Sequence, residues 1–163
     1  DFDELSARIL KRLDAEYSAI RDAIRSRFPQ KAFRYMLDYL ALERLSYQSQ
    51  NTDICESFTK STTLGAIMPP TVQDGSGKWI IDKNHRFFTD DIHYGLCIGK
   101  WMAEKANLAT PTLDEIIAWA QGVLGERIID GDRLVLGGSK CATDFSTGVP
   151  SQYGMESIDD VVD

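Results

Sequence analysis

The chain has 163 residues, enough for one domain with a sizeable core, because a chain of this length buries roughly 70% of its unfolded surface. Its 18 basic and 25 acidic residues give a net charge of −7, which argues against a nucleic-acid backbone or an anionic membrane as the main partner. The three cysteines are widely spaced and in no metal-ligand pattern, and no apolar run reaches the ~18 residues of a membrane helix. We therefore expect no metal site, no membrane partner and a reducing, cytoplasmic location.

The first half of the chain is predicted to form helices followed by a loop. Apolar residues recur about every four positions over residues 5–28, which is typical of one face of an amphipathic helix, and Pro29 ends it. Further helices are predicted for residues 31–47 and 52–62. The stretch MPPTVQDGSGKW then predicts a loop, after which residues 79–81 form a short extended segment.

A helix is predicted for residues 91–106, after an unusually charged stretch, NHRFFTDDIHYGL. Thr89 is its expected N-cap, and the two aspartates that follow complement the helix dipole. Gly95 and Gly99 lie four residues apart on one face, where we expect close approach of another backbone.

The next helix is predicted to begin after Pro111, with Thr112 and Glu115 forming a capping box, and to stop at Gly125. The glycine-rich remainder predicts mostly irregular structure, with Ser157 capping a final short turn. These patterns indicate an all-α domain of five or so helices spanning residues 1–163. Because the sequence begins at Asp1, already inside a helical pattern, we expect it to be a piece of a longer polypeptide.

No self-contained catalytic set is visible in the sequence. The two histidines read as bystanders: His85 as a solvated loop residue and His93 as a residue of a helical first turn, where the dipole disfavours a proton. No glycine-rich phosphate loop follows a predicted strand, and no serine lies in a nucleophile elbow. The tyrosines between residues 35 and 47 are more simply explained by core packing than by ligand binding.

Arg86 and Asp91 leave two interpretations open. In the first, they belong to the start of a helix, where Asp91 complements the dipole and Arg86 makes a surface ion pair of little energetic value. In the second, Arg86 lies on an irregular segment where its guanidinium can meet a phosphate, and Asp91 orients an imidazole from another element. From the residues alone the first interpretation is slightly favoured.

The stretches RFFTDDIHYGL, TPTLDEIIAWAQGVLG and VPSQYGMESIDDV together resemble the C-terminal helical domain of the opine dehydrogenase family, the octopine/nopaline type, and most closely its octopine dehydrogenase branch. The resemblance extends over essentially the whole chain. It implies a two-domain enzyme in which an N-terminal Rossmann domain of the same polypeptide binds NAD(H) or NADP(H). The implied reaction is the reductive condensation of an amino acid with an α-keto acid, through a Schiff base that receives a hydride.

The resemblance also implies roles for three residues. Arg86 matches the arginine that reaches the cofactor pyrophosphate, and Asp91 matches the carboxylate that holds the catalytic histidine of the other domain. Tyr35 falls where relatives carry a tryptophan beside the amino-acid site. The glycine fingerprint and the catalytic histidine would lie upstream, so the chain alone is expected to be inactive. The alternative is a stand-alone helical protein-interaction module without catalysis.

Overall fold

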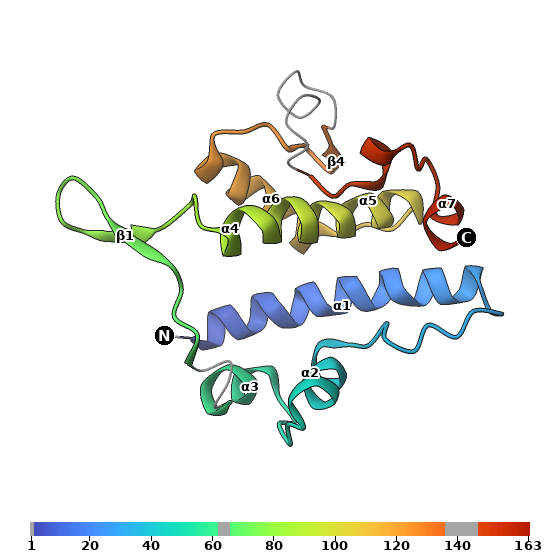
Figure 1. Cartoon of the computed structure of the whole chain (residues 1–163), viewed down its shortest axis with the longest axis horizontal. Helices are drawn as coiled ribbons and strands as arrows, with labels where there is room; N and C mark the ends of the chain where they lie inside the picture. Colours follow the sequence, from blue (N-terminus) through green and yellow to red (C-terminus); the bar gives the residue numbers. More distant parts are fainter. Residues whose placement is uncertain (1, 62–65, 136–146) are drawn as a thin grey trace. The chain divides into compact units, whose positions relative to one another are not determined.

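The computed structural model describes residues 2–61, 66–135 and 147–163. By their internal contacts these residues divide into two compact units, Asp1–Pro69 and Pro70–Asp163. Helices dominate both units, as predicted, and the strands are only two or three residues long (Figure 1). Across the described ranges, no helix combines the length and the apolar character that a bilayer crossing requires. Cys141 and the glycine pair at 137–138 lie outside the described residues.

The first unit is built on α1, Glu4–Arg27, which confirms the predicted first helix. The Asp3 side chain accepts a hydrogen bond from the backbone N–H of Ser6 at 2.8 Å and so caps the helix start. At the other end the Phe28 N–H still donates to the Ile24 carbonyl at 3.0 Å, and proline at the next position prevents a further turn.

The second helix, α2, covers Tyr39–Tyr47 only, so the prediction of helix from residue 31 was wrong. Polar groups of α1 hold the preceding segment in an irregular course: Arg25 donates to the Met36 carbonyl, and Asp14 accepts from the Tyr39 N–H at 3.2 Å. Asp38 then caps α2 by accepting from the Ala41 N–H. These tertiary hydrogen bonds outweigh the helical periodicity of residues 31–38.

The third helix, α3, runs from Ile54 to Lys60 and is capped by Asp53. Lys11 on α1 pairs with the Asp53 carboxylate at 2.6 Å, which ties the start of α3 to α1. On the other side of α3, the Phe58 ring stacks between those of Phe2 and Tyr39, with centroids 4.5 and 5.7 Å away. This half-buried aromatic stack lies beside a small buried core made mainly of aliphatic side chains, among them Ile20, Ile24 and Ile54.

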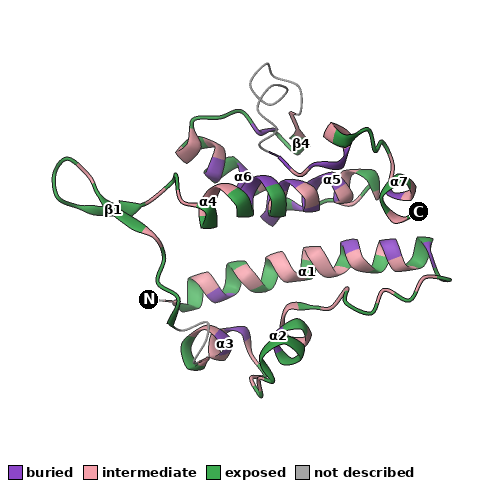
Figure 2. Cartoon of the chain, viewed as in Figure 1, coloured by how far each residue is buried: buried purple, intermediate pink, exposed green. Residues whose placement is uncertain are grey.

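The second unit begins with a hairpin of β1, Thr71–Gln73, and β2, Trp79–Ile81. Asp74 shapes its turn by accepting from the backbone N–H groups of Ser76 and Lys78. Strand β2 confirms the predicted extended segment, whereas β1 lies where a loop was predicted. All six strand residues are exposed (Figure 2).

Three helical segments follow without a break: α4, Arg86–Asp90; η2, a π-helix, Asp91–Leu96; and α5, Cys97–Lys105. Helix α6, Pro111–Leu124, packs against η2 and α5. The buried side chains of this unit gather on these helices and on the tail, as the purple segments of Figure 2 show. They include Cys97, Trp101, Ala103, Leu113, Ile117, Ala120, Val149 and Ile158.

The start of α6 differs from the prediction and its end agrees with it. Pro111 is the first helical residue and Thr112 is buried within the first turn, so the predicted capping box with Glu115 was wrong. Gly125 stops the helix with a left-handed backbone, φ +72°, a conformation that other residues adopt at a cost.

The tail contains short elements that the sequence only partly predicted. Strands β3, Ile129–Asp130, and β4, Arg133–Leu134, form a small antiparallel pair that was expected to be irregular. The 3₁₀-helix η3, Pro150–Tyr153, precedes α7, Ile158–Val162. Ser157 caps α7 as predicted, in a reciprocal box with Asp160.

Candidate functional site

Arg86 is the first residue of a helix and not part of an irregular segment before one. The cap is His85, whose Nδ1 accepts from the Phe87 N–H at 3.1 Å. The predictions that Thr89 caps this helix and that it starts at residue 91 were therefore wrong by one turn. Histidine is outside the usual set of capping residues, which explains why the sequence pattern missed it.

The Arg86 guanidinium is accessible. Arg86 is exposed, its Cζ lies 5.7 Å from the centre of the Phe87 ring, and it forms no ion pair within the described part of the chain. The surface ion pair of the first interpretation is thus not made there. An unpaired guanidinium on the first turn of a helix, where backbone N–H groups also point outward, suits an anionic group such as a phosphate.

Asp91 is the first residue of η2, five positions after Arg86. Although the residue as a whole is exposed, partial desolvation of its carboxyl is the main cause that raises its pKa above the ordinary value. The neighbouring Asp90 charge raises the pKa further, and Arg86 opposes both effects. A carboxylate in this situation gains more from a cationic partner than a fully hydrated one does.

The helix widens at Asp91. In the π-helical turn the Cys97 N–H bonds to the Ile92 carbonyl, five residues back, instead of to the carbonyl four back. This turn admits one extra residue and leaves the His93 carbonyl to accept two bonds from the tail, from Gly148 N–H and Thr147 Oγ1, each at 3.1 Å. Single π-turns of this kind are frequent at functional sites.

The sequence suggested that another segment approaches the helix closely at Gly95. The close approach occurs instead at Gly148, in the tail. A Cβ added at Gly148 would lie 2.7 Å from Tyr94 Cδ1 and 2.8 Å from Ile98 Cδ1, whereas one at Gly95 would meet nothing within 4 Å. The expectation was therefore wrong at Gly95, and at Gly99 it stays a prediction. The π-turn changes which residues share a face, so a four-residue spacing does not carry its usual meaning here.

His93 is buried in the middle of the continuous helix and not in its first turn. Its Nε2 lies 3.0 Å from Glu126 Oε2. This pairing and the two bonds to its carbonyl connect η2 to Glu126 and to the tail, which is a structural role. That His93 is a bystander in catalysis stays a prediction.

Tyr35 lies in the other unit, in the irregular segment before α2, and is 77% exposed. The packing role considered for the tyrosines fits Tyr39, which is part of the aromatic stack, but not Tyr35. Arg86 and Asp91 share one helical run, so the structure brings these two predicted residues together; Tyr35 belongs to a separate unit.

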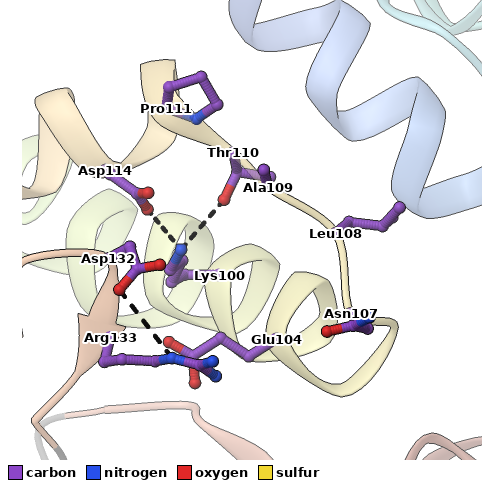
Figure 3. A pocket seen from close by; sticks show the side chains of 10 residues that line it. All are labelled: Lys100, Glu104, Asn107, Leu108, Ala109, Thr110, Pro111, Asp114, Asp132 and Arg133. Carbon is purple, nitrogen blue, oxygen red and sulfur yellow. Dashed lines mark hydrogen bonds and ion pairs between the residues drawn. The ribbon is translucent and has the colours of Figure 1, made fainter.

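A hollow of about 410 Å³ in the second unit contains a charged pair that the sequence analysis missed (Figure 3). Lys100, only 2% exposed, directs its Nζ to Asp114 Oδ1 at 2.6 Å and to Thr110 Oγ1 at 3.2 Å. The pair joins α5 to the first turn of α6. None of the predicted site residues lines this hollow. A lysine in an apolar helical stretch resembles any solvated lysine in sequence, so no signal could have found it.

Neither a metal site nor a complete cofactor site is formed by the described residues. Within those ranges no three His, Cys, Asp or Glu side chains are grouped to hold a metal ion. For a nicotinamide dinucleotide, Arg86 is suited to one phosphate contact, and a phosphate-binding loop would have to come from another domain.

Comparison with known proteins supports the resemblance. Residues 1–124 match the family described as NAD/NADP octopine/nopaline dehydrogenase, alpha-helical domain. The chain is 30% identical to an opine dehydrogenase of Haliotis discus hannai over 98% of its own length and 39% of that protein's. Over 57% of its length it is 33% identical to a tauropine dehydrogenase of Arabella iricolor, covering 22% of that protein.

Solved structures share the fold. An octopine dehydrogenase structure with NADH and L-arginine superposes with a TM-score of 0.80 at 23% identity, over 98% of this chain and 39% of that one. A second, with NADH and agmatine, gives the same values. These matches include 98% of this chain. The chain thus spans only about 39% of the length of these relatives.

Proposed function

Because the chain belongs to the octopine/nopaline dehydrogenase family, matching its α-helical domain over residues 1–124, we propose that it is the substrate-closing domain of an opine dehydrogenase. The complete enzyme is an NAD(P)H-dependent oxidoreductase that condenses an amino acid with an α-keto acid and reduces the resulting imine. An N-terminal Rossmann domain of the same polypeptide binds the cofactor, which supplies the hydride. The chain alone does not turn over. Its unpatterned cysteines support a reducing, cytoplasmic location.

The observation that carries this proposal is the joint position of Arg86 and Asp91. Arg86 begins one uninterrupted helix and Asp91 lies five positions further along it. The Arg86 guanidinium has no ion-pair partner in the described residues, and the Asp91 carboxylate is partly desolvated. A purely structural helix start needs neither feature. They are the two charges that a cleft-closing domain would contribute to a cofactor phosphate and to a catalytic imidazole.

In the proposed enzyme, Arg86 binds the cofactor pyrophosphate across the cleft and so couples cofactor binding to domain closure. Asp91 accepts a hydrogen bond from the catalytic histidine of the other domain. It fixes the histidine tautomer and stabilises the imidazolium formed when the histidine takes a proton from the substrate. The raised pKa of Asp91 supports this role, because pairing with an imidazolium relieves the energetic cost of its partly desolvated charge.

Tyr35 is proposed to contact the amino-acid substrate. Its high exposure supports this, since a side chain that only packed would not be 77% accessible. A phenol in this position offers both an aromatic face and a hydrogen-bond donor, so it would select among amino acids by their side chains.

The test is a steady-state assay of NADH and NADPH oxidation by the complete polypeptide, with panels of amino acids and α-keto acids. Oxidation that requires both an amino acid and a keto acid supports the proposal. The chain of 163 residues, assayed alone, should show none. A complete polypeptide that binds neither cofactor nor substrate would support the interaction-module alternative instead.

A further inference from the structure

Phe87, at the start of α4, is an aromatic residue that contributes little to the core. It directly follows Arg86 in the first turn of the helix, and its side chain is 45% exposed. The next residue, Phe88, instead packs edge to face against Trp119 of α6, with ring centroids 5.7 Å apart. Core packing therefore accounts for Phe88, but it does not account for the position of the Phe87 ring.

The Phe87 ring contacts both of the residues that precede it in the chain. Arg86 places its Cζ over the ring, 5.7 Å from the ring centroid. The imidazole of His85 lies nearly perpendicular to the ring, with centroids 4.7 Å apart and an angle of 81° between the planes. His85 is itself fixed, because its Nδ1 accepts a hydrogen bond from the Phe87 N–H at 3.1 Å. The ring is thus held on a capped helix start, with the Arg86 guanidinium over it.

A ring in this position restrains the guanidinium without occupying its hydrogen-bond donors. The face of the ring is the negative end of a quadrupole, which attracts a cation that lies within about 6 Å of the centroid. A phenyl ring accepts no ordinary hydrogen bond, and Arg86 forms no ion pair within the described ranges, so its planar fork of N–H groups stays available to a phosphate. An arginine that is already held loses less conformational freedom on binding than a mobile one.

We propose that Phe87 is a positioning residue, which holds the Arg86 guanidinium in the orientation in which it meets the cofactor pyrophosphate. The inference rests on the proposed function, since it takes Arg86 to be the residue that binds this group. Phe87 acts through Arg86 and needs no contact of its own with the cofactor. Because the ring is largely exposed, its removal lowers the affinity for the cofactor and leaves the stability of the fold nearly unchanged.

The test is a double-mutant cycle in the complete polypeptide, with the dissociation constant of NADH measured by calorimetry. Phe87→Leu should raise this constant about 2- to 10-fold, the effect of having to order one long side chain on binding. Its kcat at saturating NADH should not change, as expected for a loss of binding alone. Phe87→Tyr keeps the ring and should retain full affinity. In the Arg86→Ala background, Phe87→Leu should have no further effect, because the group that it positions is gone.

Two controls separate this role from a structural one. The thermal midpoint of Phe87→Leu should match that of the unsubstituted polypeptide, because the cap at His85 involves only the backbone of Phe87. Trp79→Leu removes another exposed ring of the same unit, and it should leave NADH affinity unchanged.

Three results would each overturn the proposal: full affinity in Phe87→Leu, an equal loss in Trp79→Leu, or a further loss when Phe87→Leu is added to Arg86→Ala. Full affinity in Arg86→Ala alone is a different result, because it would refute the cofactor role of Arg86 on which the inference rests. The single variants and the double variant therefore distinguish a failure of the positioning role from a failure of the proposed function.

Discussion

Gly148 donates its backbone N–H to the His93 carbonyl at 3.1 Å, and this bond joins the tail to the π-turn that starts at Asp91. The contact requires a glycine, because an added Cβ would lie within 2.8 Å of both Tyr94 and Ile98 side chains. A residue far away in sequence thus supports the π-turn that begins at Asp91, the residue that we propose to act in catalysis.

Gly148→Ala should therefore destabilise the fold. Overpacking of this kind typically costs about 1–3 kcal/mol, and relief would require the Tyr94 ring and the Ile98 methyl to move. Chemical denaturation of the 163-residue chain measures the effect. The control is Gly122→Ala, in the interior of α6 with nothing within 4 Å of the new methyl, which should stabilise by about 0.5–1 kcal/mol. Equal changes in the free energy of unfolding for the two substitutions would show that Gly148 is not closely packed against the π-turn.

The buried pair of Lys100 and Asp114 gives a second prediction. Lys100→Met removes the ammonium that lies 2.6 Å from Asp114 and leaves a poorly hydrated carboxylate, so unfolding should become easier by about 3–5 kcal/mol. The double variant Lys100→Met with Asp114→Leu removes both charges and should be markedly more stable than the single one. Unfolding free energies that simply add in this cycle would contradict the coupling between the two residues.

The sequence predicted those features that depend on local pattern. α1 follows from its apolar stripe and the proline after it, and Gly125 ends α6 because a left-handed residue is needed there. It failed where contacts distant in sequence decide the structure. Residues 31–38 have a helical pattern, yet the bond that Arg25 donates to the Met36 carbonyl and the bond that Asp14 accepts from the Tyr39 N–H prevent the helix.

The same limit applies to the candidate site. Arg86 and Asp91 could be singled out because their charges exceed what a helix start needs. The π-turn between Asp91 and Leu96 leaves no mark in residue periodicity, since it depends on bonds donated by Thr147 and Gly148. The burial of Lys100 and Glu43 likewise depends on neighbours that only the folded chain brings together.

The raised pKa of Asp91 predicts a pH-dependent effect of Asp91→Asn on stability. Desolvation and the Asp90 charge make ionised Asp91 less favourable in the folded chain than in the unfolded chain, where its pKa is near 3.8. The folded state therefore binds more protons, and stability is lost as the pH rises through the folded pKa. At about pH 7 the asparagine variant should have the higher thermal midpoint. This advantage should shrink as the pH falls toward 3.8, which thermal scans across that range can measure. A variant that is less stable than the unsubstituted chain at neutral pH would contradict this.

Arg86→Ala in the complete polypeptide should weaken NADH binding while leaving the fold intact. A hydrogen bond to a charged group contributes about 1.5–3 kcal/mol, so the dissociation constant should rise about 10- to 100-fold. Lys83→Ala is the matched control, because it removes a nearby exposed positive charge that has no assigned role. Calorimetry with NADH distinguishes a specific contact from general electrostatic attraction, since equal losses in the two variants would leave Arg86 without a cofactor role.

The proposed catalytic role of Asp91, acting through a histidine of the other domain, can be tested by steady-state kinetics of Asp91→Asn beside Asp90→Asn in the complete polypeptide. Asparagine keeps the size and hydrogen-bonding capacity of Asp91 but removes the charge that stabilises an imidazolium. General acid–base assistance is typically worth 10²–10⁴-fold, so kcat should fall within about that range with NADH affinity nearly unchanged, and its pH profile should shift. Asp90→Asn should leave kcat close to that of the unsubstituted enzyme. Equal and small effects of both substitutions on kcat would rule out this role and leave Asp91 as a structural residue of the helix.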